Sequence, residues 1–432
     1  MVHWSVTYAP NTNTLDESDI AAIRQDFPIL STQVNGHPLV YLDSGATSQK
    51  PSVVLDAERD FSLHRNSAVH RGAHTLAALA TEEFEAARET VARFVGADAD
   101  EIVWTSNATE GINLVAYGIS NATTAGTESA RFVLGTGDEI LVTELEHHAN
   151  LIPWQQLALR TGATLRFIPV DDDGALELDR LDDLITERTR VVAVAHVSNV
   201  LGVINPVETI TRRAHAVGAL VVLDACQSAP HLPLDLHALE VDFAVFSGHK
   251  IFGPTGIGVV YGKRDILEAM PPWQGGGNMI ADVTFEKTVY QPIPNKFEAG
   301  TGNIADAVGL GAAIDYVNRV GIENIARYEH ELLVYGMAQL RTIPGVRLIG
   351  TADDKASVMS FVLAGYTTEE VGQALNDEGI AVRTGHHCAQ PILRRFGVET
   401  TVRPSLAFYN TFEEIDRLIA VVRRLASVRR VG

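Results

Sequence analysis

The sequence predicts an α/β protein: a large, doubly wound domain with a mainly parallel sheet flanked by helices, followed by a smaller α+β domain. Apolar strands and helices alternate over residues 101–261, as is typical of doubly wound folds. The stretch 191–195 is apolar without alternation, which indicates a parallel strand covered on both faces. From residue 305 a long helical pattern and shorter strands indicate the second domain. A chain of 432 residues, 46% of them hydrophobic, can form both cores.

Hydrophobic periodicity predicts the individual elements. Strands are expected at 39–43, 101–105, 139–143, 164–170, 191–196, 220–224, 243–246, 258–261, 346–349 and 358–363. Helices are expected at 19–26, 81–95, 110–117, 152–160, 179–185, 207–217, 305–342 with a break near Gly321, 368–378 and 412–427. The segment 120–137, rich in Thr, Ser, Ala and Gly, is expected to be a surface loop insertion.

These elements group into four segments. Residues 1–17 are polar and are expected to form a flexible tail, and residues 18–32 are expected to pack with the small domain. Residues 33–304 are assigned to the large domain. Residues 305–432 are assigned to the small domain, which carries the loop around Cys388.

Composition excludes several classes of function. The formal net charge is −20, so nucleic-acid or anionic-membrane binding is not expected, because those surfaces would repel the chain. Two cysteines, Cys226 and Cys388, cannot form a disulfide framework and suit a reducing compartment. The sequence carries neither a signal-peptide pattern nor a run of ~18 apolar residues, so a soluble, cytoplasmic protein is expected.

A lysine and an aspartate follow two of the apolar strands. Lys250 comes after the strand 243–246, where a partly dry site would favour the neutral amine that forms Schiff bases; taken alone, a surface lysine is the simpler interpretation. Asp224 ends the strand 220–224, at the sheet edge where ligands gather. A carboxylate there is either a structural cap or the partner of a cation such as the pyridinium nitrogen of pyridoxal phosphate (PLP). Gln227 is close enough in sequence to bind the phenolic oxygen of that cofactor.

Donors for a cofactor phosphate occur nearby in the predicted topology. Thr109 lies where a helix begins, so backbone N–H groups there can bind a phosphate, although a helix cap without a ligand is the alternative. Ser247 and His249 can add side-chain donors, and an ordinary loop histidine is the alternative for His249.

Two adjacent histidines, His147 and His148, suggest a metal site at first sight. Neighbouring side chains usually diverge, and cysteines and carboxylates do not follow at ligand spacing, so no metal is expected. A histidine ring stacked on the cofactor is the preferred interpretation.

Cys388 lies in a polar loop at residues 383–389. The thiolate is the reactive form of cysteine, and cationic groups favour it. Such groups are present in the same loop: Arg383, His386 and His387. A buried structural cysteine is the alternative, and the polar loop argues against it. Cys226, beside an apolar strand, is expected to pack in the interior.

Eight short motifs follow one another along the chain: LDSGA at 42–46, VHRGAH at 69–74, ATEGIN at 108–113, EHHAN at 146–150, HVSN at 196–199, SGHK at 247–250, FEAGT at 297–301 and RTGHHC at 383–388. In this order they resemble the SufS-type (group II) cysteine desulfurases, fold-type I PLP enzymes of the class V aminotransferase superfamily. The resemblance covers about residues 18–427. The short loop RTGHHC is similar to group II, whereas group I members carry a longer, serine-rich loop.

The resemblance implies roles for the motif residues. Lys250 would hold the cofactor as a Schiff base, His147 would stack on its ring, and Cys388 would accept the sulfur. Further cofactor contacts would come from Thr109, Asp224, Gln227, Ser247 and His249, and from Thr301 of the other subunit of a homodimer. The substrate carboxylate would be bound by Asn199, Arg383 and Arg403.

The resemblance also implies a seven-stranded sheet and the conversion of L-cysteine to L-alanine with a persulfide on Cys388. The sulfur would pass to an acceptor protein, SufE-like or SufU-like, for Fe–S cluster assembly. Cys226 departs from the family pattern, because Asp-Ala-Cys-Gln replaces a more usual Asp-Gly-Ala-Gln. Gln274 stands where some relatives have Glu.

Three alternative functions remain open. A selenocysteine lyase or a kynureninase-like hydrolase would use the same scaffold, and the hydrolase would not need Cys388. A metal-binding or non-enzymatic sulfur-carrier scaffold would use the histidines and Cys388. Such a scaffold would be colourless, and its function would survive Lys250→Ala.

Overall fold

The computed structural model describes residues 14–125 and 130–428. Its largest sheet has seven strands in the order β4-β10-β9-β8-β7-β5-β6. In chain order these are β4 (Ile102–Thr105), β5 (Glu139–Thr143), β6 (Thr164–Ile168), β7 (Thr189–Ala195), β8 (Leu220–Asp224), β9 (Phe243–Ser247) and β10 (Gly258–Gly262). Within this sheet only β10 pairs antiparallel to its neighbours, so the predicted mainly parallel seven-stranded sheet is confirmed.

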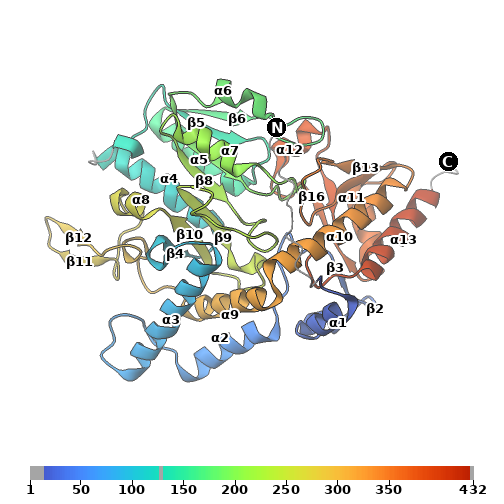
Figure 1. The fold of residues 1–432 in the computed structure, drawn as a ribbon, viewed down its shortest axis with the longest axis horizontal. Coiled ribbons are helices and arrows are strands. Elements are labelled where there is room, and N and C mark those ends of the chain that lie inside the picture. Colours follow the sequence, from blue (N-terminus) through green and yellow to red (C-terminus); the bar gives the residue numbers. More distant parts are fainter. Residues whose placement is uncertain (1–13, 126–129, 429–432) are drawn as a thin grey trace.

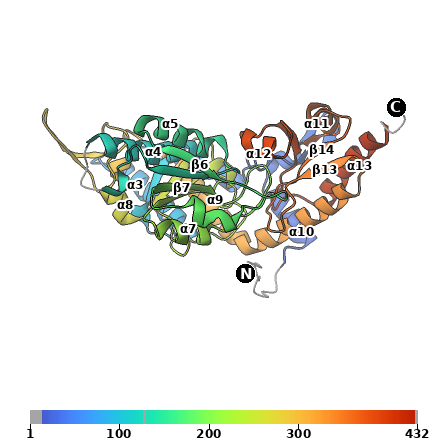
Figure 2. The same ribbon diagram turned by 90° about the horizontal axis from the view of Figure 1, so that it is seen from above.

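Helices cover both faces of this sheet. They are α2 (Ser52–His64), α3 (Thr75–Phe94), α4 (Ala108–Ala125), α5 (Ile152–Thr161), α6 (Leu181–Leu184), α7 (Val207–His215), α8 (Arg264–Ala269) and α9 (Ile304–Val320). Figure 2 shows α4 and α5 on one side of the strands and α7 on the other. The contacts agree: α4 packs on β9 and β10, and α7 packs on β7 and β8. Helix α9 packs against α2 and α3.

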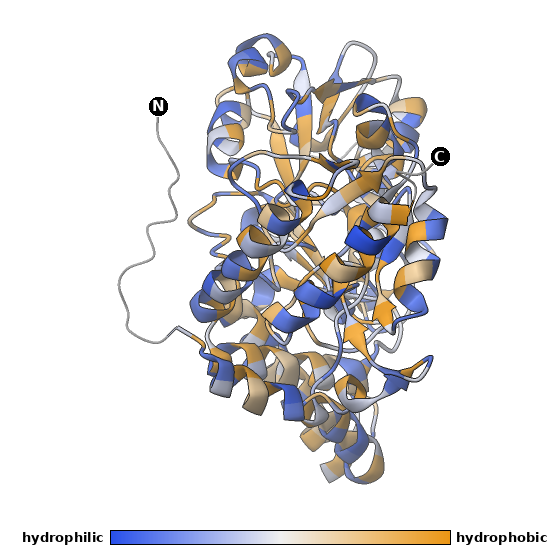
Figure 3. Cartoon of the chain, turned by 90° about the vertical axis from the view of Figure 1, so that its right-hand side faces the viewer, coloured by the Kyte–Doolittle hydropathy of each residue, from blue (hydrophilic) through white to orange (hydrophobic). Residues whose placement is uncertain are grey.

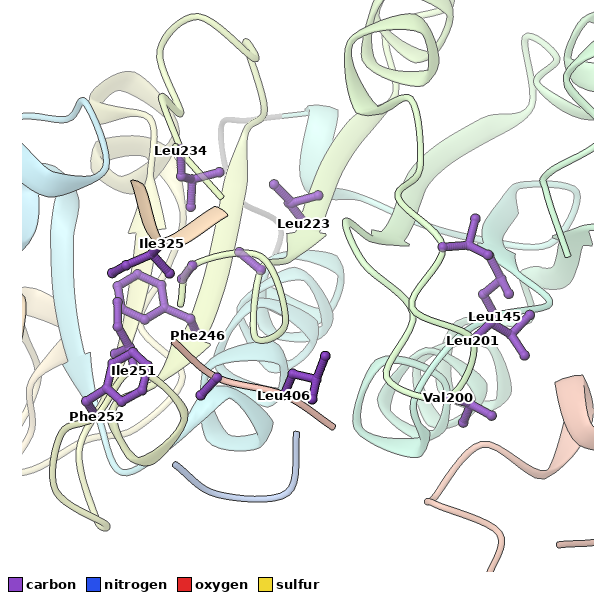
Figure 4. Close-up of a cluster of buried hydrophobic side chains, with 14 of the residues drawn as sticks. Leu145, Val200, Leu201, Leu223, Leu234, Phe246, Ile251, Phe252, Ile325 and Leu406 are labelled. Carbon is purple, nitrogen blue, oxygen red and sulfur yellow. The ribbon is translucent and has the colours of Figure 1, made fainter. Parts of the chain in front are cut away.

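Alternate side chains of one strand enter two separate hydrophobic clusters. In β8, Val221 and Leu223 belong to one cluster, whereas Leu220 and Val222 belong to the other. All five residues of the strand are buried, as expected of a sheet covered on both faces. Leu223 and Phe246 appear in the first cluster in Figure 4.

One glycine allows α4 to lie close to the sheet. A Cβ at Gly111 would meet Val260 Cγ2 at 2.7 Å and Val245 Cγ1 at 3.0 Å. Because any larger side chain would push the helix away from β9 and β10, Gly111 fixes the start of α4 near the strand ends. This start is the position predicted to bind a phosphate.

The helices of the C-terminal part of the chain and a four-stranded antiparallel sheet lie together (Figure 1). They comprise α10 (Ile322–Arg341), α11 (Thr368–Asn376), α12 (Gln390–Arg395) and α13 (Phe412–Val428), with β13 (Val346–Ile349), β14 (Ser360–Leu363), β16 (Arg383–Gly385) and β17 (Thr401–Arg403). The predicted break near Gly321 is confirmed, because Gly321 ends α9 with φ +91°. Figure 3 shows hydrophilic and hydrophobic residues interspersed along the outer helices of this part.

Shorter elements lie outside these two sheets. At the N-terminus α1 (Glu17–Gln25) is capped by Asp16, and Arg24 pairs with Glu414 of α13 at 2.8 Å. Strand β3 (Val40–Tyr41) pairs in parallel with β15 (Ile380–Ala381). Two hairpins complete the fold: β1 (Gln33–Val34) with β2 (His37–Pro38), and β11 (Ile280–Val283) with β12 (Thr288–Tyr290). The four predicted domain limits stay a prediction.

The prediction of a loop insertion at 120–137 is wrong in part. Helix α4 continues to Ala125, and a 3-10 turn follows at Ala130–Phe132. Ile119, Ala122 and Phe132 are buried in one hydrophobic cluster, so apolar periodicity outweighs the low helix propensity of the threonines. Residues 126–129, and residues 1–13 of the predicted tail, lie outside the described residues.

Across the described ranges, every helix is too short or too polar to cross a membrane. The same residues contain no group of three or more His, Cys, Asp or Glu side chains that could hold a metal ion.

Candidate active site

A cavity of about 440 Å³ lies at the carboxyl ends of β7, β8 and β9. This edge of an open α/β sheet is where ligands bind. Ten of the residues predicted for the site line it: Thr109, His147, Asn199, Asp224, Gln227, Ser247, His249, Lys250, Arg383 and Arg403. Residues far apart in sequence therefore meet in one cavity, and most of them end a strand or lie shortly after its end.

Asp224 and Lys250 come from adjacent strands. Asp224 ends β8, is 6% exposed, and accepts a hydrogen bond from the backbone N–H of Cys226 at 2.9 Å. Lys250 ends a 3-10 turn that follows β9. The turn is tight because Gly248 leaves no room for a side chain; a Cβ there would lie 2.7 Å from Ile257 Cγ2. The strand pairing thus brings a buried carboxylate and an amine to one cavity.

His147 presents a neutral imidazole to the same cavity. Burial, reinforced by the positive charge of Lys250, lowers the pKa of His147 to about 4. Its Nδ1 accepts a hydrogen bond from Ala149 N–H at 3.0 Å, so the neutral ring carries its proton on Nε2. The ring is therefore fixed in one tautomer, with Nε2–H as a donor.

Glu146 holds the turn that carries His147. Its carboxyl group lies within 2.6 Å of Thr143 Oγ1, 2.9 Å of Ala195 N and 2.6 Å of Asn150 Nδ2. Burial raises the pKa of Glu146 to about 8. These bonds tie β5, β7 and the following turn together around a buried carboxyl group.

The start of α4 provides donors for an anion. Ser247 Oγ accepts from Ala108 N–H at 2.9 Å, which leaves its own proton free to donate. Asn107 caps the helix by accepting from Glu110 N–H at 2.9 Å. Thr109 is exposed on the first turn. A helix N-terminus with adjacent hydroxyls is a favourable environment for a phosphate.

His249 lies in the turn that follows Ser247. It contacts Thr47 Oγ1 through Nδ1 at 3.2 Å, and burial together with the charge of Lys250 lowers its pKa to about 4. Gln227, 3% exposed, donates from Nε2 to the carbonyl of Gly45 at 2.8 Å, which orients its amide.

Arg403 is the most buried cation of the cavity. It is 2% exposed; Nη1 donates to the backbone carbonyl of Asn199 at 2.8 Å and Nη2 to Asp43 Oδ1 at 3.3 Å, while Nε has no partner in the described part of the chain. Burial lowers the pKa of Arg403 to about 10, and the group stays charged at neutral pH. Arg383 pairs in register with Arg403 on the neighbouring strand and is exposed. The two guanidinium groups make this end of the cavity suited to a carboxylate.

Cys388 lies outside the residues that line the cavity, although its neighbour His387 lines it. Its carbonyl accepts from His148 N–H at 2.6 Å, and its N–H donates to His386 Nδ1 at 3.1 Å. The thiol is partly buried. Cys226 is buried, as predicted, and it also lines the cavity beside Asp224; burial raises the pKa of its thiol.

Thr301 is exposed and lines a second cavity of about 560 Å³. Ser106 and Gly256 line both cavities, so the two adjoin. The prediction assigns Thr301 to the site of a partner subunit, and it stays a prediction.

Sequence reasoning missed several residues that shape the site. Asn107, Asp43 and Glu146 stood in or beside recognised motifs, and Asn107 before a helix is itself a capping signal. Thr47 gave no signal, because its contact with His249 joins positions 202 residues apart.

Known proteins resemble this chain over most of its length. The family described as Aminotransferase class-V matches residues 40–418. A cysteine desulfurase of Synechococcus elongatus is 60% identical over 410 residues, covering 94% of this chain and 64% of that protein. A probable cysteine desulfurase 2 of Mycobacterium leprae is 52% identical over 416 residues, covering 96% and 98%. The chain thus spans less than two thirds of the first relative's length and almost all of the second's.

Two solved structures share the fold. The apo cysteine desulfurase of Thermococcus onnurineus NA1 has a TM-score of 0.88 and 38% identity, covering 94% of this chain and 98% of that one. A C-DES mutant with glycine covalently linked to its PLP cofactor has a TM-score of 0.78 and 25% identity, covering 93% and 98%. Because the family match spans most of its length, the chain belongs to the class V aminotransferase family.

Proposed function

We propose that this chain is a PLP-dependent cysteine desulfurase, which converts L-cysteine to L-alanine and takes the sulfur on Cys388. The observation that carries the proposal is a single cavity lined by Lys250, Asp224 and Arg403, with the Cys388 loop beside it. Relatives named cysteine desulfurase, at 52% and 60% identity, support the same activity.

The residues of the cavity fit PLP. A buried Asp224 suits the ring nitrogen, Lys250 suits the aldehyde, and the start of α4 with Ser247 suits the phosphate. Gln227 would bind the phenolic oxygen, and Thr109, His249 and a partner subunit's Thr301 would add phosphate contacts. Bound PLP would supply an electron sink that acidifies the Cα–H bond of the substrate.

The side chains of this chain would then divide the work. Arg403, Arg383 and Asn199 would hold the substrate carboxylate at the basic end of the cavity. The amine of Lys250 would take the Cα proton, and the neutral ring of His147 would lie against the cofactor ring. The Cys388 thiolate would attack the substrate sulfur: an S–S bond forms, the C–S bond breaks, and its electron pair stays on the carbon fragment, which takes up protons to become alanine.

The finer assignments rest on the resemblance to SufS-type enzymes. We infer a group II enzyme from the short loop RTGHHC at 383–388. The persulfide would pass to a SufE-like or SufU-like acceptor for Fe–S cluster assembly, in a cytoplasmic homodimer. The domain limits given above belong to the same proposal.

The test is alanine release from L-cysteine with a reductant present. Cys388→Ser should abolish it, and Cys226→Ser, which alters the other cysteine, should retain most of it. Equal release from the wild type and Cys388→Ser would remove Cys388 from the reaction. A PLP-loaded wild type that releases no alanine would refute the proposed substrate.

A further inference from the structure

The loop that carries Cys388 is tied to the cavity through one side chain. Asn199, 7% exposed, donates from Nδ2 to the carbonyl of His387 at 2.7 Å, across 188 residues of sequence. The orientation of the amide is unambiguous, because the flipped amide would set two carbonyl oxygens against each other. One of the two Nδ2 protons is used in this bond, and the other is left for a second acceptor.

The loop needs such support because of its backbone. His387 and Cys388 have φ values of +51° and +55°, in the left-handed region that residues with a Cβ disfavour. Two successive residues of this kind persist only where neighbouring contacts hold them. Besides Asn199, those contacts include His148 N–H to the Cys388 carbonyl at 2.6 Å and His387 Nε2 to Thr401 Oγ1 at 2.9 Å.

The backbone of Asn199 is bound at the basic end of the cavity. Arg403 donates from Nη1 to the backbone carbonyl of Asn199 at 2.8 Å, and its buried Nε has no hydrogen-bond partner among the described residues. Arg403 lies on β17, which pairs with β16, the strand that leads into the loop. A carboxylate bound by Asn199 and Arg403 would therefore contact two residues that hold the Cys388 loop. Asn199 holds it through the His387 carbonyl, and Arg403 lies on the strand paired with β16.

We propose that Asn199 is a positioning residue for Cys388. Through its bond to the His387 carbonyl, Asn199 holds the loop more firmly when a carboxylate occupies the site. A carboxylate that accepts the second Nδ2 proton fixes the plane of the amide. The bond to His387 then breaks less often, and the thiol stays where it meets the substrate sulfur. This inference rests on the proposed function for the identity of the carboxylate.

Asn205 offers a matched control. It is 2% exposed and donates from Nδ2 to the Ala195 carbonyl at 2.7 Å; like that of Asn199, its buried Oδ1 has no partner within residues 14–125 and 130–428. Its acceptor lies on β7 instead of the Cys388 loop. Asn199→Ala and Asn205→Ala therefore remove equivalent bonds, and only the first one touches the loop.

The experiment uses PLP-loaded protein in a Cys226→Ser background, so that Cys388 is the single thiol. Iodoacetamide alkylation of Cys388 and hydrogen exchange of residues 386–389 are measured with and without saturating L-alanine. Asn199→Ala and the isosteric Asn199→Asp should speed both by about fivefold, the factor for one net hydrogen bond. L-Alanine should slow alkylation and hydrogen exchange in the wild type and in Asn205→Ala. It should slow neither rate in the two Asn199 variants.

Unchanged loop rates in both Asn199 variants, or an equal change in Asn205→Ala, would overturn the inference. With L-cysteine, a positioning role lowers kcat for persulfide formation as well as raising KM, whereas carboxylate binding alone raises KM. The loop measurements need no turnover. If the wild type releases no alanine from L-cysteine while the loop responds as expected, the proposed function fails and the coupling stands.

Discussion

The two sides of the cavity are built differently. On the sheet side, Asp224 and Ser247 end strands whose residues are all buried, and Lys250 follows in a tight turn. On the loop side, Cys388 is partly exposed, has a left-handed backbone, and is held by a few hydrogen bonds from distant segments. Strand ends place groups that must stay fixed, whereas a loop can bring a thiol to a substrate and then away to an acceptor.

This difference predicts unequal responses to substitution. Changes on the sheet side should alter the chemistry and leave the loop unmoved. Changes on the loop side should alter the mobility of the loop more than the cofactor site.

The largest effect is expected from Lys250→Ala. The amine that would take the Cα proton is removed, so kcat for alanine release should fall on the order of 10³-fold or more. Lys263→Ala is the control, because Lys263 pairs with Asp242 at 3.2 Å away from the cavity. Iodoacetamide alkylation of Cys388 should be unchanged in Lys250→Ala, and a large change there would mean that the two sides are not independent.

Sequence reasoning succeeded on the sheet side for a physical reason. Apolar runs such as 220–224 mark buried parallel strands, and function gathers where such strands end, so Asp224 and Lys250 could be predicted to meet. The loop side depends on contacts such as Asn199 to His387, which no local pattern encodes. Strands β15 and β16 have two and three residues, too short for periodicity to reveal.

An intermediate effect is expected from Glu146→Gln, which tests how the sheet side holds His147. The pKa of Glu146 is raised to about 8 in the folded protein, whereas an unfolded chain has a carboxyl pKa near 4.3. Between about pH 4.5 and 8 the unfolded chain binds fewer protons than the folded one at this site, so stability falls as the pH rises, by up to about 1.4 kcal/mol per pH unit.

The measurement is the free energy of unfolding from urea titrations at pH 5.5, 6.5 and 7.5. Because the isosteric amide cannot ionise, the free energy of unfolding of the wild type should fall relative to that of Glu146→Gln as the pH increases. Parallel curves would mean that Glu146 keeps the same charge in the folded and unfolded states.

The smallest effect is expected on the loop side, at His148. Its ring stacks on that of His386 with centroids 5.8 Å apart and planes at 30°, and burial together with His386 lowers the pKa of His148. Packing of the Cys388 loop against His148 therefore disfavours the protonated ring. This packing should weaken as the pH falls below about 6.5, the pKa of a free histidine. Hydrogen exchange of residues 386–389, corrected for intrinsic rates, should rise a few-fold between pH 7.5 and 5.5.

His148→Phe keeps an aromatic ring and the backbone N–H that holds the Cys388 carbonyl, but it cannot be protonated. The exchange of residues 386–389 in this variant should be nearly independent of pH over the same range. An equal rise in the variant would mean that protonation of His148 does not loosen the loop. Because His148 follows His147 directly, the cofactor spectrum serves as the internal control: it should be the same in both proteins if the sheet side stays fixed while the loop loosens.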